Sequence, residues 1–62
     1  MKRRDLLRHL SVNGCLEVRE GGIHSWWSNP ANNLRTAIPR HTEINEHLAR
    51  KICRDLGVEF PG

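Results

Sequence analysis

Length is the strongest constraint on what this chain can fold into. Its 62 residues suffice for one domain over residues 1–62, and a domain of this size buries only about 60% of the surface that its unfolded chain exposes. Such a domain cannot easily enclose a deep ligand pocket and still keep a hydrophobic core. We therefore expect any binding site to lie across a face or an edge of the molecule.

Hydrophobic spacing predicts five elements in the order α-β-β-β-α. Leucines at helical spacing end at Asn13-Gly14, and short alternating segments follow between turn-forming residues. A last helical segment begins at Asn45, a suitable N-cap, and stops at Gly57. The fold class is α+β, with two helices on one face of a three-stranded antiparallel sheet. The elements are expected over 3–13 (helix), 15–19, 23–28 and 34–38 (strands) and 45–56 (helix).

Alternation along the strands predicts which side chains face the helices. We expect Leu16, Val18 and Ile23 to mark the core side of the sheet. Because neighbouring strand residues point to opposite faces, Trp27 then packs inward and His24 points away from the helices.

The charge balance favours a polyanionic partner. Ten Lys and Arg residues against seven Asp and Glu give a net charge of +3, and most of the excess is arginine, whose planar guanidinium suits phosphate. On the last helix, Arg50, Lys51 and Arg54 gather opposite the apolar stripe and form a candidate RNA-binding surface. An ordinary solvated helix face explains the same pattern, so charge alone does not decide between them.

Cysteine usage and hydropathy predict a reduced, cytoplasmic protein. Cys15 and Cys53 both fall on predicted apolar faces, where free cysteines are common, and no segment has the length or composition of a signal peptide or a membrane span. Zinc ligands normally occur in tight pairs, whereas the two cysteines lie far apart and five residues separate His41 from His47. We expect no metal site and no cofactor.

His24 is the candidate catalytic residue. Imidazole titrates near pH 6.5 and therefore moves protons at neutral pH, and RNA carries its own nucleophile in the 2′-hydroxyl. A solvated or partner-covered histidine is the ordinary alternative. Trp26, on the same face as His24, could stack on a base or anchor a protein partner, and we favour the partner interface.

Three stretches together resemble the HicA toxins. They are KRRDLLRHL with the following Asn-Gly, GIHSWW with the following Asn-Pro, and LRTAIP, and the closing helix also matches in length and spacing. The likeness covers about residues 2–58. Two positions depart from the family pattern: Ile23 stands where the family has serine, and Ser25 stands where it has a second histidine, which removes one candidate proton donor.

The resemblance implies a double-stranded-RNA-binding-like fold and the toxin of a type II toxin–antitoxin pair. It implies a metal-independent endoribonuclease (mRNA interferase) with His24 as general acid or base, and a HicB-like antitoxin that covers the active site. Arg35, on the same sheet face as His24, is our candidate for binding phosphate. The alternatives are a non-catalytic RNA-binding module of this fold and a protein-interaction domain anchored by Trp26.

Overall fold

The computed structural model describes residues 1–61 and contains the five predicted elements in the predicted order. The α+β class and the α-β-β-β-α order are confirmed, and each boundary lies within two residues of its predicted position. The elements are α1 (Arg3–Val12), β1 (Leu16–Gly21), β2 (His24–Asn29), β3 (Leu34–Pro39) and α2 (Glu46–Asp55).

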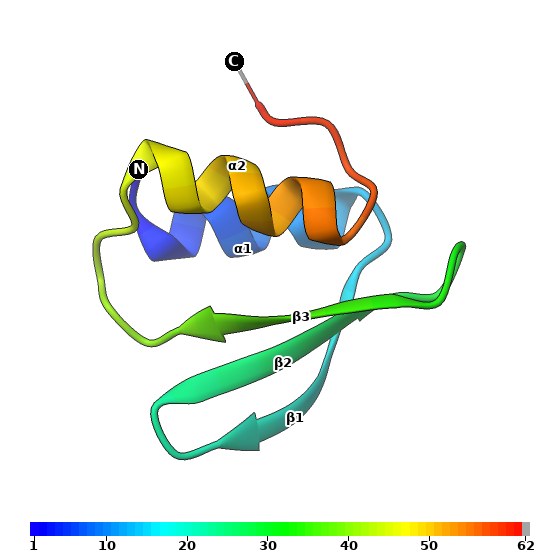
Figure 1. Ribbon diagram of the computed structural model, residues 1–62, viewed down its shortest axis with the longest axis horizontal. Helices are drawn as coiled ribbons and strands as arrows, with labels where there is room; N and C mark the ends of the chain where they lie inside the picture. Colours follow the sequence, from blue (N-terminus) through cyan, green and yellow to red (C-terminus); the bar gives the residue numbers. More distant parts are fainter. Residues whose placement is uncertain (62) are drawn as a thin grey trace.

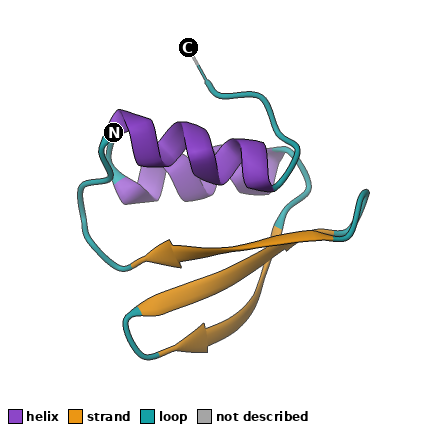
Figure 2. Ribbon diagram, viewed as in Figure 1, coloured by secondary structure: helices purple, strands orange, loops and turns teal. Residues whose placement is uncertain are grey.

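The three strands form one antiparallel sheet in the order β1-β2-β3. Both helices lie on the same side of this sheet, and β3 runs beneath them while β1 is the strand farthest from them (Figure 1). The result is a layer of helix above a layer of strand, with the face of the sheet opposite the helices left bare (Figure 2). We call this bare side the outer face.

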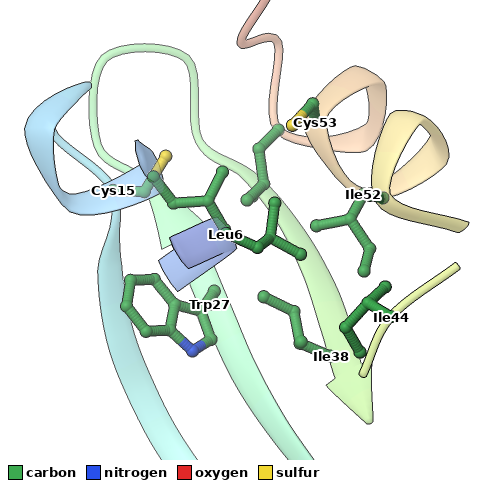
Figure 3. Close-up of a cluster of buried hydrophobic side chains, with 10 residues drawn as sticks. Leu6, Cys15, Trp27, Ile38, Ile44, Ile52 and Cys53 are labelled. Atoms are coloured by element: carbon green, nitrogen blue, oxygen red, sulfur yellow. The ribbon is translucent and has the colours of Figure 1, made fainter. Parts of the chain in front are cut away.

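The hydrophobic core fills the space between the helices and the sheet. Leu6 of α1, Trp27 of β2 and Ile38 of β3 point into the cluster, which Ile52 of α2 closes from the helix side (Figure 3). Trp27 therefore packs inward, as the alternation predicts. Full burial of each large apolar side chain stabilises the fold by about 1.5–3 kcal/mol. The buried set is Leu6, Leu10, Cys15, Trp27, Ile38, Ile44, Ala49, Ile52, Cys53 and Leu56.

Asparagine side chains hold both ends of α2. Asn45 precedes the helix and its side-chain oxygen accepts a hydrogen bond from the Leu48 amide at 2.8 Å, which is the predicted N-cap. At the other end, the Asn29 and Asn32 side-chain amides donate to the Leu56 carbonyl at 2.8 and 3.1 Å. Because Asn29 is buried, the loop after β2 is tied firmly to the end of α2.

The expected core positions of the first hairpin are wrong. Leu16, Val18 and Ile23 are 57%, 50% and 77% exposed. Leu16 pairs with Ser28, which follows the inward-facing Trp27, so Leu16 lies on the outer face. A β-bulge between Glu17 and Arg19 then interrupts the two-residue alternation of β1.

The position of β1 in the sheet also contributes to this exposure. β1 is the strand farthest from the helices (Figure 1), and every residue from Leu16 to Glu20 is exposed. Ile23 belongs to the turn between β1 and β2 rather than to a strand. The helices are thus too narrow a layer to cover all three strands.

Both cysteines are free and buried. Burial raises the pKa of the Cys15 thiol, and burial together with the neighbouring Cys15 raises the pKa of Cys53. Thiols held in the neutral form are poor nucleophiles, so these two residues serve the core and not a reaction.

Candidate active site

His24 is the first residue of β2 and lies at one end of the sheet. Gly21 of β1 pairs with it on one side and Pro39 of β3 on the other. Its neighbour Ser25 is buried toward the helices, so alternation directs the half-buried His24 side chain to the outer face, as predicted. Strand pairing on both sides fixes the backbone that carries the imidazole.

A pocket of about 330 Å³ opens beside His24. One wall comes from the turn between β1 and β2, and the other from the chain that leaves β3 after Pro39. The pocket is open at the surface, as expected for a domain too small to enclose a deep cavity. Its lining consists of Gly22, Ile23, His24, Pro39, Arg40 and His41.

Arg40 fastens the two walls of this pocket to each other. Its backbone amide donates to the Ile23 carbonyl at 3.3 Å, and its guanidinium donates to the Gly22 carbonyl at 3.2 Å and to the Glu20 carboxylate. Through its contacts with an acidic side chain and two carbonyls, Arg40 holds the pocket together.

Arg3 of α1 holds the same end of the sheet from the helix side. Its Nε donates to the Pro39 carbonyl and its Nη2 to the Ser25 hydroxyl, each at 2.9 Å. These two acceptors flank His24, one beside it along β2 and one across from it on β3. Arg3 is thus a positioning residue for the histidine.

Position 25 lies outside the pocket. The Ser25 side chain is buried, faces the helix layer and accepts a hydrogen bond from Arg3. A side chain at this position points away from the pocket into which His24 opens, because neighbouring strand residues face opposite sides. A histidine at position 25 would therefore point away from the pocket, and having serine there leaves the set of proton donors in the pocket unchanged.

Arg35 shares the outer face with His24, but the two residues are far apart. Arg35 pairs with Ser28, whereas His24 pairs with Pro39. The four residue steps from Arg35 to Pro39 span about 13 Å at the usual rise of a strand. The structure therefore does not bring Arg35 to the His24 pocket.

A second hollow surrounds Trp26 in the middle of the outer face. It measures about 380 Å³ and is lined by Val18, Arg19, Trp26 and Arg35. Trp26 is 44% exposed, so its indole is accessible in a hollow that Arg19 and Arg35 also line. Arg35 thus belongs with Trp26 rather than with His24.

The basic residues of α2 lie in the helix layer, away from both hollows. Arg50 approaches Glu46 at 3.5 Å and stacks over the Phe60 ring at 4.3 Å, and Lys51 Nζ donates to Asp55 Oδ2 at 2.7 Å. Exposed pairs of this kind stabilise a helix by only a few tenths of a kcal/mol, roughly 0.3–0.5 kcal/mol each. Internal pairing already occupies two of the three residues predicted to bind RNA there.

Asp55 receives more than one of these contacts. The hydrogen bond from Lys51 is the main cause that holds the pKa of Asp55 below its ordinary value, and the Thr36 hydroxyl and the charge of Arg54 act in the same direction. Thr36 Oγ1 donates to Asp55 Oδ2 at 3.1 Å, so this carboxylate joins α2 to β3.

The α-β-β-β-α fold matches the one that the family resemblance implies. A family model described as HicA toxin of bacterial toxin-antitoxin matches residues 3–58. The chain belongs to the HicA toxin family. A comparison with curated proteins and one with solved structures found no match. As a HicA family member the protein is a toxin of a toxin–antitoxin system, and this membership implies an antitoxin partner.

Two further properties concern ions and membranes. Among residues 1–61, no three His, Cys, Asp or Glu side chains are grouped in a way that would hold a metal ion. Within the same residues, neither helix of this HicA protein has the length and apolar character needed to cross a membrane.

Sequence reasoning does not find His41 as part of the site. Its spacing to His47 indicates no metal pair, and local sequence carries no other sign of a role. Only the pairing of Pro39 with His24 brings the residues after β3 close to His24. The one available signal is positional: His41 comes two residues after the proline that ends the strand next to His24.

Proposed function

We propose that this HicA toxin is a metal-independent endoribonuclease that cleaves mRNA, with His24 as the general acid or base. The observation that supports this function is the placement of His24 in an open pocket on the outer face, on a backbone fixed by two paired strands. A preorganised proton-transfer group contributes roughly 10²- to 10⁴-fold to a rate. Because the proposed substrate is mRNA, the activity would take place in the cytoplasm.

RNA supplies the nucleophile for the proposed reaction. His24 takes the proton from a 2′-hydroxyl, the 2′-oxygen attacks the adjacent phosphorus, the bond from phosphorus to the 5′-oxygen breaks, and the departing oxygen takes up a proton. The products are a 2′,3′-cyclic phosphate and a 5′-hydroxyl. An open pocket suits this reaction because a flexible single strand can lie across it without being enclosed.

We further propose that the RNA extends from the pocket along the outer face toward Trp26 and Arg35. The distance of about 13 Å from the His24 end of β3 to Arg35 requires the strand to continue over more than one nucleotide. Arg50, Lys51 and Arg54 lie on the helix side and would contact only a substrate large enough to wrap around an edge of the domain. Of these three, Arg50 and Lys51 would first have to exchange internal contacts for phosphate.

The antitoxin is proposed to be HicB-like and to cover the outer face. Val18 and Trp26 are exposed at the second hollow, and Leu16 is exposed on the same outer face. Exposed apolar patches of this kind mark protein interfaces. Trp26 is the proposed anchor, because tryptophan is enriched among the residues that dominate interface energies.

The first experiment compares induced expression of the protein with His24→Ala and with His9→Ala as a matched control. His9 lies on α1 outside the pocket, where its ring contacts the Glu59 carbonyl. We expect growth arrest and fragmented mRNA with the unchanged chain and with His9→Ala, and neither with His24→Ala. Purified protein should leave 2′,3′-cyclic phosphate and 5′-hydroxyl ends.

Three results would contradict the proposal in different ways. A 3′-hydroxyl and a 5′-phosphate on the fragments would rule out attack by the 2′-oxygen. RNA binding that weakens with salt, without cleavage and without dependence on His24, would identify a non-catalytic RNA-binding module. A protein that ignores RNA at low salt but captures a protein partner through Trp26 would be an interaction domain.

A further inference from the structure

The His24 pocket contains a second imidazole. His24 lies on the β2 wall and His41 on the wall formed by the chain after β3, and both line the same hollow of about 330 Å³. Transfer to a cyclic phosphate needs two proton movements: one from the attacking 2′-hydroxyl and one to the departing 5′-oxygen. His24 provides for only one of them at a time.

The backbone of His41 is held on both sides. The residue before it, Arg40, is tied to the turn between β1 and β2 through the Ile23 and Gly22 carbonyls. The residue after it, Thr42, accepts a hydrogen bond from the Arg3 amide at 2.8 Å. His41 itself is exposed. Because its chain segment is hydrogen-bonded to the turn between β1 and β2 and to α1, its backbone is held in place and only the side-chain rotamer is left to vary.

We propose that His41 is the general acid of the reaction and donates the proton to the departing 5′-oxygen. This inference rests on the proposed function. His24 accepts the 2′-hydroxyl proton while the bond from the 2′-oxygen to phosphorus forms. As the bond from phosphorus to the 5′-oxygen breaks, the His41 imidazolium gives its proton to that oxygen. His24 ends protonated and His41 neutral, and exchange with water restores both.

The other polar groups near the pocket do not fit this role. The Ser25 hydroxyl is buried on the helix side of the sheet. The Arg40 guanidinium is engaged by Glu20 and by the Gly22 carbonyl, and guanidinium does not release protons at neutral pH. Of the residues that line the pocket, His24 and His41 are the two with an imidazole, the side-chain type that most often serves as a general acid or base.

The test uses a sulfur leaving group. The linkage that the purified protein cleaves is first mapped, and a short RNA is then made with that linkage in its ordinary form and with sulfur in place of the bridging 5′-oxygen. A thiol has a pKa of about 8.5, so a thiolate leaves without a proton donor. A general acid is therefore needed for the oxygen linkage and dispensable for the sulfur linkage.

We expect His41→Ala to slow cleavage of the oxygen linkage by roughly 10²- to 10⁴-fold and to cleave the sulfur linkage within about tenfold of the unchanged protein. His24→Ala should be slow on both linkages, because attack by the 2′-oxygen still needs a base. His9→Ala, the matched control, should equal the unchanged protein on both. His41→Gln, which keeps a polar side chain of similar length, repeats the test if His41→Ala loses the fold.

The outcomes separate this inference from the function on which it rests. If the unchanged protein does not cleave RNA, the proposed function fails. Cleavage that needs His24 but proceeds at full rate in both His41 variants overturns the role of His41 alone. If His41→Ala loses equal activity on the oxygen and sulfur linkages, His41 shapes the pocket without donating a proton. If the sulfur linkage restores cleavage by His24→Ala and not by His41→Ala, His24 is the general acid and the assignment is reversed. Each of these results contradicts the proposal.

Discussion

Replacing Arg3 tests whether the helix layer holds the histidine end of the sheet in place. Arg3→Gln removes the two guanidinium hydrogen bonds to the Pro39 carbonyl and the Ser25 hydroxyl, both at 2.9 Å. The Arg3 backbone amide still donates to the Thr42 carbonyl, so only the side chain is tested. The buried Ser25 hydroxyl then loses its hydrogen-bond donor, and β2 and β3 lose the side-chain hydrogen bonds that join them to Arg3 of α1.

The expected loss of stability is large for so small a domain. Hydrogen bonds to charged groups contribute about 1.5–3 kcal/mol each. Both of these bonds are only partly buried, so the lower end applies and the two together come to about 3 kcal/mol. For a domain of this length, about 3 kcal/mol lowers Tm by roughly 12–24 °C.

Urea denaturation followed by tryptophan fluorescence, with Tm measured by circular dichroism, gives the free energy of unfolding. Arg4→Gln is the matched control, since Arg4 is the next residue of α1 and its side chain is exposed. Ser25→Ala completes a double-mutant cycle with Arg3→Gln, and we expect a coupling of about 1 kcal/mol between the two positions. Cleavage by Arg3→Gln should also fall at temperatures where the variant is still folded.

Two results would refute this reasoning. If Arg3→Gln loses no more stability than Arg4→Gln, the two hydrogen bonds contribute nothing in solution. If the effects of Arg3→Gln and Ser25→Ala simply add, the two residues do not interact, and Arg3 cannot be holding β2 through Ser25.

The remaining predictions concern Asn29, the loss of stability at acid pH, and the two tryptophans. Asn29→Ala should lower the free energy of unfolding by about 1–3 kcal/mol in urea titrations, because its buried amide holds the end of α2. The pKa of Asp55 is lowered in the folded protein, mainly by Lys51, so its contribution is present above the unfolded pKa of about 3.9 and is lost as the pH falls through the folded value. Stability measured from pH 6 to pH 2 should therefore decline less in Asp55→Asn than in the unchanged protein. Trp27→Ala should lower the free energy of unfolding by about 3–5 kcal/mol, whereas Trp26→Ala should lower it by only about 1 kcal/mol. In calorimetric titrations, Trp26→Ala should weaken antitoxin binding by about 2 kcal/mol or more.

The order of elements was predictable because each one carries a local signal. Asn45 caps a helix by its own side chain. Trp27 also faces the core as predicted, although Ile23, from which the alternation is counted, is exposed in the turn before β2. Such signals depend on neighbours in sequence. They therefore hold without knowledge of what packs against the element.

The face of β1 was not predictable for the opposite reason. Leu16 and Val18 are apolar and alternate with charged residues, which is the pattern of a strand with one buried face. The bulge after Glu17 and the position of β1 beyond the helices are properties of the assembled sheet. The sequence of a strand does not state whether a second layer will reach it.

His41 illustrates the same limit at the candidate site. Its place in the pocket depends on the register between β2 and β3, in which Pro39 lies opposite His24. A register shifted by two residues would keep every side chain on its face and yet move His41 away from His24. Alternation can therefore assign His24 to the outer face, but it cannot place a second histidine beside it.

The thinness of the molecule connects the exposed apolar residues to the proposed regulation. Its shortest dimension is only 16 Å. The molecule consists of one layer of helix and one layer of strand, and no element within residues 1–61 covers the outer face. Trp26 and Leu16 remain uncovered there, on the face that also opens into the His24 pocket. Burying an exposed apolar surface favours association, so a partner that covers Trp26 gains energy from the same contact that blocks access to His24. Under the proposed function, a chain of this size needs no separate inhibitory site, because the antitoxin would block the His24 pocket from the exposed apolar surface beside it.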